Sequence, residues 1–390
     1  MPPLTALRLR WGVYLLLSMA ALIALAAVLT APISPVYALR YLLQSTLWML
    51  IQAAGVWRIL PRNHRPGERE LLPRFGPGNS LTLARGTLIA ALGGFLLLPR
   101  PTGPLAWLPF ALYLLADLTD FLDGYFARRS DTVTALGETL DMNHDALGVL
   151  VVTALAFQYG SVPWWYAPFG LARYLFLLGL YIHRRRGGEV LPLHPSDTRR
   201  WFAGLQMGFI TAMLAPALGP PATTFAATLF LLPFSAQFLL DYLQVTGKIE
   251  GLPLPDDMAR RLTADLPLMM RALSAAIYAA GLLESLGFHP FGRFLVPGGL
   301  PASAPPGMDV LLPGLRLVFL LALVGGVFGR LTPIAALLTL GLRLNGMPLT
   351  TGDRLLIAAL TYLLFTGMGK YAPHAPIEYL IHNRLGKRRA

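Results

Sequence analysis

The sequence predicts an all-α, polytopic membrane protein with about twelve transmembrane helices. Two observations carry this prediction: 55% of the 390 residues are hydrophobic, and only 13% are charged. A soluble chain carries about 25% charged residues, roughly twice this share. The composition therefore excludes a soluble enzyme, a disordered protein and a nucleic-acid-binding module, in spite of a formal net charge of +12. We expect no nucleic-acid partner.

Apolar stretches near the length of about 20 residues that a helix needs to cross a bilayer place the expected helices. They lie at 11–30, 38–57, 81–98, 104–127, 134–159, 163–183, 201–218, 222–246, 266–287, 311–329, 331–347 and 353–369. Proline and glycine interrupt several of them, which membrane helices tolerate. The apolar signal is weakest at 201–218 and 331–347.

The basic residues, which are nearly all arginine, give the expected orientation. When the N-terminus lies in the cytoplasm and the helices alternate, the basic clusters at 58–74, 128–129 and 184–200 fall on the cytoplasmic side. Cytoplasmic loops of membrane proteins carry an excess of Lys and Arg. We therefore expect a multi-pass protein of a bacterial-type inner (cell) membrane. The basic tail at 387–389 also favours contact with anionic membrane lipids.

Three blocks are expected along the chain. Residues 1–76 form an N-terminal membrane segment with two helices and a basic cytoplasmic loop, 77–250 a domain of six helices, and 251–390 a C-terminal domain of four helices. The first apolar stretch could also be a cleaved secretory signal, because basic residues precede it and Val36-Tyr37-Ala38 resembles a cleavage site. Its apolar core is long for a signal, so we favour an uncleaved anchor.

Four carboxylates stand near the cytoplasmic ends of two successive helices. Asp120 and Asp123 are three residues apart on one helix, and Asp141 and Asp145 are four residues apart on the next. Each pair therefore lies on one face of its helix. The short connection makes the two helices antiparallel neighbours, so the four groups can converge. Oxygen-rich clusters suit hard divalent cations such as Mg²⁺ or Mn²⁺, and the chain has no cysteine for a softer metal.

Small residues and cations surround these carboxylates. Gly124, Ala127 and Gly137 allow close approach of a ligand or a backbone, and Arg128 is a planar cation suited to phosphate.

Upstream, Asn79 is expected to cap the helix at 81–98, followed by Ser80 and Thr82, with Arg85 on the same face as Thr82. A helix N-terminus offers free N–H groups to an anion. The combination favours phosphoryl-group chemistry on a membrane-embedded substrate.

The spacing of these residues resembles a family signature. It reads Asp120-x₂-Asp123-Gly124-x₂-Ala127-Arg128-x₈-Gly137-x₃-Asp141-x₃-Asp145, which matches without a gap the signature of the CDP-alcohol phosphatidyltransferase family. The segment Asn79-x₂-Thr82-x₂-Arg85 resembles the part of the family that precedes its first helix. The resemblance covers about 77–246 and implies a unit of six helices.

The resemblance implies a role for each matched residue. Asp120, Asp123, Asp141 and Asp145 would hold Mg²⁺ or Mn²⁺, expected as two ions, and Asp145 would be the general base. The CDP-alcohol would be bound by Asn79, Ser80, Thr82, Gly124, Ala127, Arg128, Thr134 and Gly137. The implied reaction transfers a phosphatidyl group from a CDP-alcohol, expected to be CDP-diacylglycerol, to a hydroxyl acceptor, and CMP leaves.

Three further arginines bear on the identity of the acceptor. Arg173, Arg199 and Arg200 favour an acceptor with its own phosphate, such as glycerol phosphate or inositol phosphate, although the last two could simply be topology charges. A homodimer is one expected assembly.

The last block resembles a DoxX-type membrane domain at Val327-Phe328-Gly329-Arg330-Leu331-Thr332-Pro333 and Thr366-Gly367-Met368-Gly369. The alternatives are a transporter that uses the carboxylates as a proton or cation relay, and a partner-binding protein with a vestigial catalytic unit.

Overall fold

The computed structural model describes residues 1–192, 197–249, 261–288, 296–298 and 307–372. Within these ranges the regular elements are all helices, so the all-α class is confirmed. The start of the expected C-terminal domain, 251–260, and the basic tail at 387–389 lie outside the described residues.

Each expected apolar stretch overlaps one α-helix of the structure. The helices are α1 (Pro3–Thr30), α2 (Pro35–Ile59), α3 (Pro77–Gly93), α4 (Leu108–Arg129), α5 (Ala135–Gln158), α6 (Ala172–Arg185), α7 (Asp197–Met213), α8 (Ala222–Val245), α10 (Leu266–Ser285), α11 (Met308–Gly325), α12 (Leu331–Arg343) and α13 (Thr351–Thr366). Among the described residues, five helical segments are long and apolar enough to cross a membrane: Pro3–Thr30, Gly103–Arg129, Ala135–Gln158, Ala222–Val245 and Leu266–Ser285. The chain is therefore a polytopic integral membrane protein.

Several helix starts differ from the sequence prediction, and two of them have a clear cause in a proline. The stretch 163–183 is divided into a 3₁₀ segment, Trp164–Leu171, and α6, because Pro168 lies inside the first part and cannot donate a helical hydrogen bond. Helix α3 begins at Pro77 rather than at residue 81, since proline fits the first turn of a helix, where no intrahelical partner exists for an N–H group.

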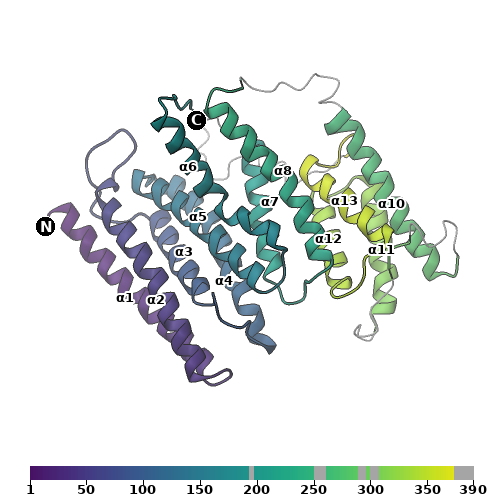
Figure 1. Ribbon diagram of the computed structural model, residues 1–390, viewed down its shortest axis with the longest axis horizontal. Helices are drawn as coiled ribbons and strands as arrows, with labels where there is room; N and C mark the ends of the chain where they lie inside the picture. The colour runs from purple at the N-terminus through teal and green to yellow at the C-terminus, as the bar shows by residue number, and fades with distance from the viewer. Residues whose placement is uncertain (193–196, 250–260, 289–295, 299–306, 373–390) are drawn as a thin grey trace.

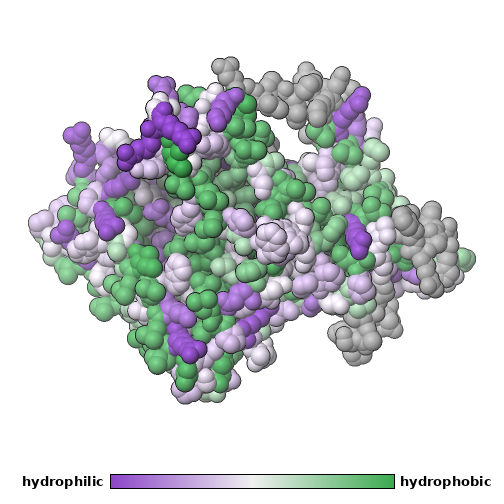
Figure 2. Space-filling view, in the orientation of Figure 1, coloured by the Kyte–Doolittle hydropathy of each residue, from purple (hydrophilic) through white to green (hydrophobic). Residues whose placement is uncertain are grey.

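The chain crosses the molecule from α1 and α2 at one end to the C-terminal helices at the other, where α12 and α13 lie nearer to α8 than α10 does (Figure 1). One hydrophobic core joins buried side chains of α1–α5, α7 and α8, and a second core joins α10–α13. The two meet where Leu337 of α12 packs against both. Figure 2 shows hydrophobic side chains along the helices, with hydrophilic ones gathered at the end where α6 finishes; the last turn of α6 carries Arg184 and Arg185.

A buried ion pair holds the start of α13. Asp353, which is 0% exposed, accepts hydrogen bonds from Arg343 of α12 and, at 2.8 Å, from the hydroxyl of Thr350. The backbone N–H of Asp353 donates to Thr350 Oγ1 at 3.1 Å, and that of Thr350 donates to Asp353 Oδ2 at 3.0 Å, which together form a capping box. Asp353 therefore neutralises the buried charge of Arg343 and also caps the start of α13.

Replacing Asp353 by Ala is expected to lower the free energy of unfolding by about 3–5 kcal/mol, because it leaves the charge of Arg343 buried without its partner. Thermal unfolding of the detergent-purified protein measures the change. The matched control is Arg354→Ala, an exposed neighbour whose loss should stay within about 0.5 kcal/mol. Equal transitions for the two variants would contradict this role of the ion pair.

Candidate active site

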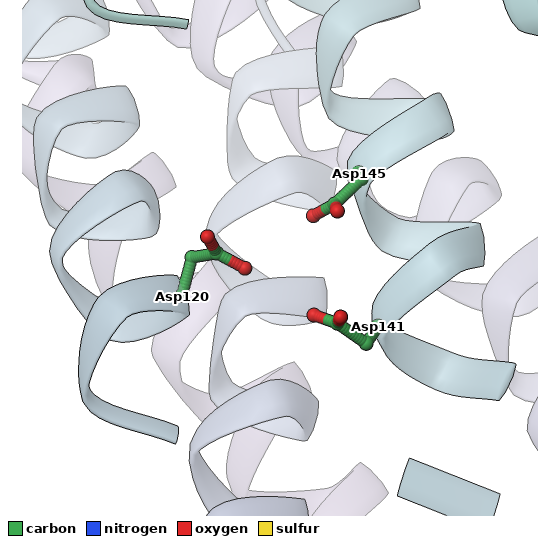
Figure 3. A group of neighbouring side chains, drawn as sticks. All are labelled: Asp120, Asp141 and Asp145. Carbon is green, nitrogen blue, oxygen red and sulfur yellow. The ribbon is translucent and has the colours of Figure 1, made fainter. Parts of the chain in front are cut away.

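Helices α4 and α5 bring carboxylates together from the two sides of a short turn. Oxygen atoms of Asp120 on α4 and of Asp141 and Asp145 on α5 all lie within 4.8 Å of one another. Figure 3 shows the three side chains pointing toward one space between the helices. The convergence predicted from the spacing of these residues is therefore present in the structure, while the roles assigned to them remain predictions.

A single buried cation, Arg85 of α3, lies among the carboxylates. Its side chain is 2% exposed, and its guanidinium donates to Asp120, to Asp141 at 2.5 Å and to Asp145 at 3.0 Å. The fourth carboxylate, of Asp123, lies 3.5 Å from Arg85 Nη2. All four acidic side chains therefore share one positive charge.

Asp123 is held more deeply than the other three carboxylates. It is 7% exposed, and its Oδ2 accepts a hydrogen bond of 2.7 Å from the hydroxyl of Thr82. Thr82 and Arg85 are three residues apart on α3, so both side chains reach the carboxylates from the same helix face. Of the predicted substrate-binding residues, Thr82 thus lies directly beside a predicted metal ligand.

Helix α3 can reach the carboxylates only because it packs unusually close to α4. A Cβ atom added to Gly78 would lie 2.7 Å from the Cβ of Ala127 and 2.8 Å from the backbone oxygen of Asp123. Ala127 is therefore in contact with the α3 backbone. Gly78 was not among the predicted site residues, although a glycine directly after the proline that starts a helix is an unfavourable choice without a packing reason.

Asn79 does not cap α3, so that prediction is wrong. The residue at the cap position is Gly76, and Asn79 lies inside the helix because Pro77 starts it two residues earlier. The Asn79 amide donates to Thr134 Oγ1 at 2.9 Å and to Asn63 Oδ1 at 3.1 Å. The segment that was expected to precede the first helix of the family is thus part of α3.

Thr134 and Gly137 form the start of α5. Thr134 is the N-cap, and its hydroxyl accepts the backbone N–H of Gly137 at 3.0 Å. An added Cβ at Gly137 would overlap Oδ1 of Asn79, so glycine allows α3 and α5 to touch there. Both residues tie α3 to α5.

The remaining residues predicted to bind the CDP-alcohol lie at the polar ends of the same helices. Gly124 precedes Arg128 by one turn on α4, and a Cβ at Gly124 would lie 3.0 Å from Arg128 Nη1. Arg128 is exposed. Ser80 is exposed too, and its hydroxyl donates to the backbone oxygen of Gly76 at 3.1 Å. Glycine at position 124 therefore leaves room for the guanidinium over the helix.

The predicted acceptor cations lie at the starts of α6 and α7. Arg173 is an exposed residue in the first turn of α6, and its charge interacts with that of Asp145. Arg199 on α7 forms a two-point ion pair with Asp241 of α8, with N–O distances of 2.8 and 3.0 Å. Arg200 follows it, but its side chain lies outside the described part of the structure. Of these three residues, Arg199 therefore has a carboxylate partner on α8.

Residues 77–239 match the family model described as CDP-alcohol phosphatidyltransferase. The helices that form the site all lie in this range, so the resemblance that the motif predicted is confirmed for this segment. The match ends before the last block, so the DoxX-like resemblance stays a prediction.

Three curated relatives are named CDP-diacylglycerol--glycerol-3-phosphate 3-phosphatidyltransferase. The protein of Bacillus subtilis is 32% identical over 127 residues, which are 30% of this chain and 66% of the relative. That of Cereibacter sphaeroides is 36% identical over 135 residues, 33% and 58% of the two chains. That of Rickettsia bellii is 40% identical over 85 residues, 22% and 45%. The chain thus covers less than two thirds of each relative, and no solved structure matches it.

We expect Gly78→Val to separate α3 from α4, because its side chain would meet backbone atoms that cannot rotate away. Such overpacking costs about 1–3 kcal/mol of the free energy of unfolding. Thermal unfolding in detergent measures it. Gly55→Val is the matched control, since a Cβ there meets no atom within 4 Å; a transition for Gly78→Val as high as that of the control would argue against the close approach.

Proposed function

We propose that this protein is a phospholipid-synthesis enzyme that transfers the phosphatidyl group of CDP-diacylglycerol to a hydroxyl of glycerol phosphate and releases CMP. The observation that carries the proposal is the convergence of Asp120, Asp141 and Asp145 within a segment that matches the phosphatidyltransferase family. The names of the relatives support glycerol phosphate as the acceptor rather than inositol phosphate.

The residues of the site fit a divalent metal. Oxygens within 4.8 Å of one another can share a cation whose metal–oxygen bonds are about 2.0–2.6 Å long. Asp120, Asp141 and Asp145 would hold Mg²⁺ or Mn²⁺, with Asp123 joining when a second ion binds. When bound, such ions neutralise the negative charge of a diphosphate and stabilise the charge that develops on it during transfer. Arg85 supplies part of this positive charge from the protein itself.

The nucleotide end of the donor is expected to lie at the polar ends of α4 and α5. Arg128 is placed to bind the phosphate that leaves with CMP, since a guanidinium can make two parallel hydrogen bonds to phosphate. Gly124 leaves room for this guanidinium over α4, because a Cβ there would lie 3.0 Å from Arg128 Nη1, while Gly137 lets α3 and α5 touch.

In the proposed reaction Asp145 accepts the proton of the acceptor hydroxyl. The hydroxyl oxygen then bonds to the phosphorus that carries diacylglycerol, the bond from that phosphorus to the bridging oxygen breaks, and CMP leaves with the electron pair. Arg85 Nη1 lies 3.0 Å from Asp145 Oδ1 and fixes the direction of the carboxylate. Arg173 would bind the phosphate of the acceptor, because its charge lies close enough to Asp145 to interact with it.

The site is expected to face the cytoplasm of a bacterial-type inner membrane. The last turns of α4 and α6 both carry paired arginines, and loops rich in Arg stay on the cytoplasmic side. This orientation would give the site access to water-soluble glycerol phosphate and CMP. A homodimer remains a prediction.

Incubation of the purified protein with CDP-diacylglycerol, Mg²⁺ and a panel of alcohols tests the proposal. CMP release and a lipid with the mass of phosphatidylglycerol phosphate are expected with glycerol phosphate, and not with inositol phosphate, inositol or serine. Chelation of the metal should stop both products. A protein that moves protons or cations across vesicles and releases no CMP would be the transporter instead.

Asp145→Asn should lower the turnover number by about 10²–10⁴-fold, because the amide cannot accept the proton. Binding of CDP-diacylglycerol, measured by calorimetry, should change far less, since the phosphates contact other residues. The matched control is Glu138→Gln, an exposed carboxylate on the first turn of the same helix. If Asp145→Asn turns over as fast as this control, Asp145 is not the base.

A further inference from the structure

A largely apolar cavity of about 490 Å³ lies between the family segment and the C-terminal helices. Helices α4, α7 and α8 form one side of it, and α12 and α13 form the other. The C-terminal wall includes Leu337 and Leu338 of α12 and Leu364 of α13, all outside the residues that match the family. The cavity is therefore formed by helices that lie further apart in the sequence than the helices of the candidate active site.

Two glycines on α7 hold this space open. Gly204 and Gly208 are one turn apart and both line the cavity. A Cβ atom added to either would meet no atom within 4 Å. Close packing therefore does not explain why these two positions carry glycine. Their lack of a side chain instead leaves the space in front of α7 unfilled.

The size and lining of the cavity fit a hydrocarbon chain. Apolar cavities of about 150 Å³ stay free of water and bind small hydrocarbons, and ligand sites span about 300–1,000 Å³. The lining helices belong to a membrane protein, so the surrounding medium offers acyl chains rather than water. A lipid chain is thus the occupant that the chemistry of the wall selects.

The cavity leads to the carboxylates along one face of α4. Phe110, Leu114 and Asp117 line it at spacings of four and three residues, and Asp120 continues the same face one turn further. Asp117 accepts a hydrogen bond from Thr211 of α7 through Oδ2, while its buried Oδ1 has no hydrogen-bond partner. The end of the cavity nearest the candidate site is therefore polar, and the rest is apolar.

We propose that the cavity binds one acyl chain of the lipid donor, and that α12 and α13 thereby set which chains the enzyme accepts. The identity of the donor rests on the proposed function, whereas the binding of a hydrocarbon chain rests on the cavity itself. The C-terminal helices then determine the specificity for the acyl chain, while the side chains that take part in the reaction lie on α3, α4 and α5.

Variants that fill the cavity from its two sides test the kinetic part. Gly208→Leu fills it from α7, and Leu338→Trp fills it from α12, where the native side chain is 44% exposed. With dioleoyl CDP-diacylglycerol, kcat/KM should fall about tenfold or more, while with the dioctanoyl donor it should stay within about twofold of wild type. Gly314→Leu on α11, where a Cβ also meets no atom within 4 Å, is the matched control.

A labelling experiment separates this inference from the proposed function. Phosphatidylglycerol with a diazirine at the end of one acyl chain is irradiated with the protein in phosphatidylcholine nanodiscs, and labelled peptides are identified by mass. Label is expected on peptides of α7 and α12, with its loss in Gly208→Leu and not in Gly314→Leu. This result needs no transferase activity, so it stands even if the panel of alcohols yields no product.

Three outcomes would overturn the inference. The first is an absence of label on α12 in the wild-type protein. The second is an equal loss of activity with short and long donors in both filling variants. The third is unchanged activity with the long donor in both variants. Thermal unfolding of each variant identifies one that fails to fold, and the other variant, from the opposite wall, then gives the answer.

Discussion

The structure of the site depends on the charge interaction between Arg85 and four carboxylates. A single acidic side chain at membrane depth already costs a few kcal/mol, and this protein places four around one guanidinium that is 2% exposed. One positive charge does not balance four negative ones, so the cluster keeps a strong attraction for further cations. The protein thus positions the carboxylates by itself, and most of the compensating positive charge has to come from bound cations.

This interaction imposes close packing on three helices. Arg85 and Thr82 reach the carboxylates because α3 touches α4 at Gly78, where no side chain intervenes. Gly137 does the same where α3 meets α5. The glycines therefore act on the chemistry indirectly, by setting the distance at which a buried cation can meet acidic groups on neighbouring helices.

The sequence predicted most of what depends on local spacing. The helical class follows from composition, and the pairing of the carboxylates follows from intervals of three and four residues across a short turn. The sequence prediction places the start of α3 too late, because Pro77 occupies its first turn and Gly76, rather than Asn79, is the cap. The intervals from Asn79 through Thr82 to Arg85 already put these residues on one face, yet the central place of Arg85 depends on the packing of α3. The cavity depends on contacts between α7 and α12, about 130 residues apart, and no local pattern could indicate it.

The cavity has its two walls, which include α7 and α12, on one polypeptide. Substitutions in the C-terminal helices can alter the fit to a membrane's own lipids without disturbing the acidic cluster, which lies on other helices. Because both walls belong to a single chain, they are always present in equal number and need no assembly step. A lineage whose membrane lipids change could therefore adjust this protein by substitutions in the C-terminal helices, while the helices that carry the acidic cluster stay constant.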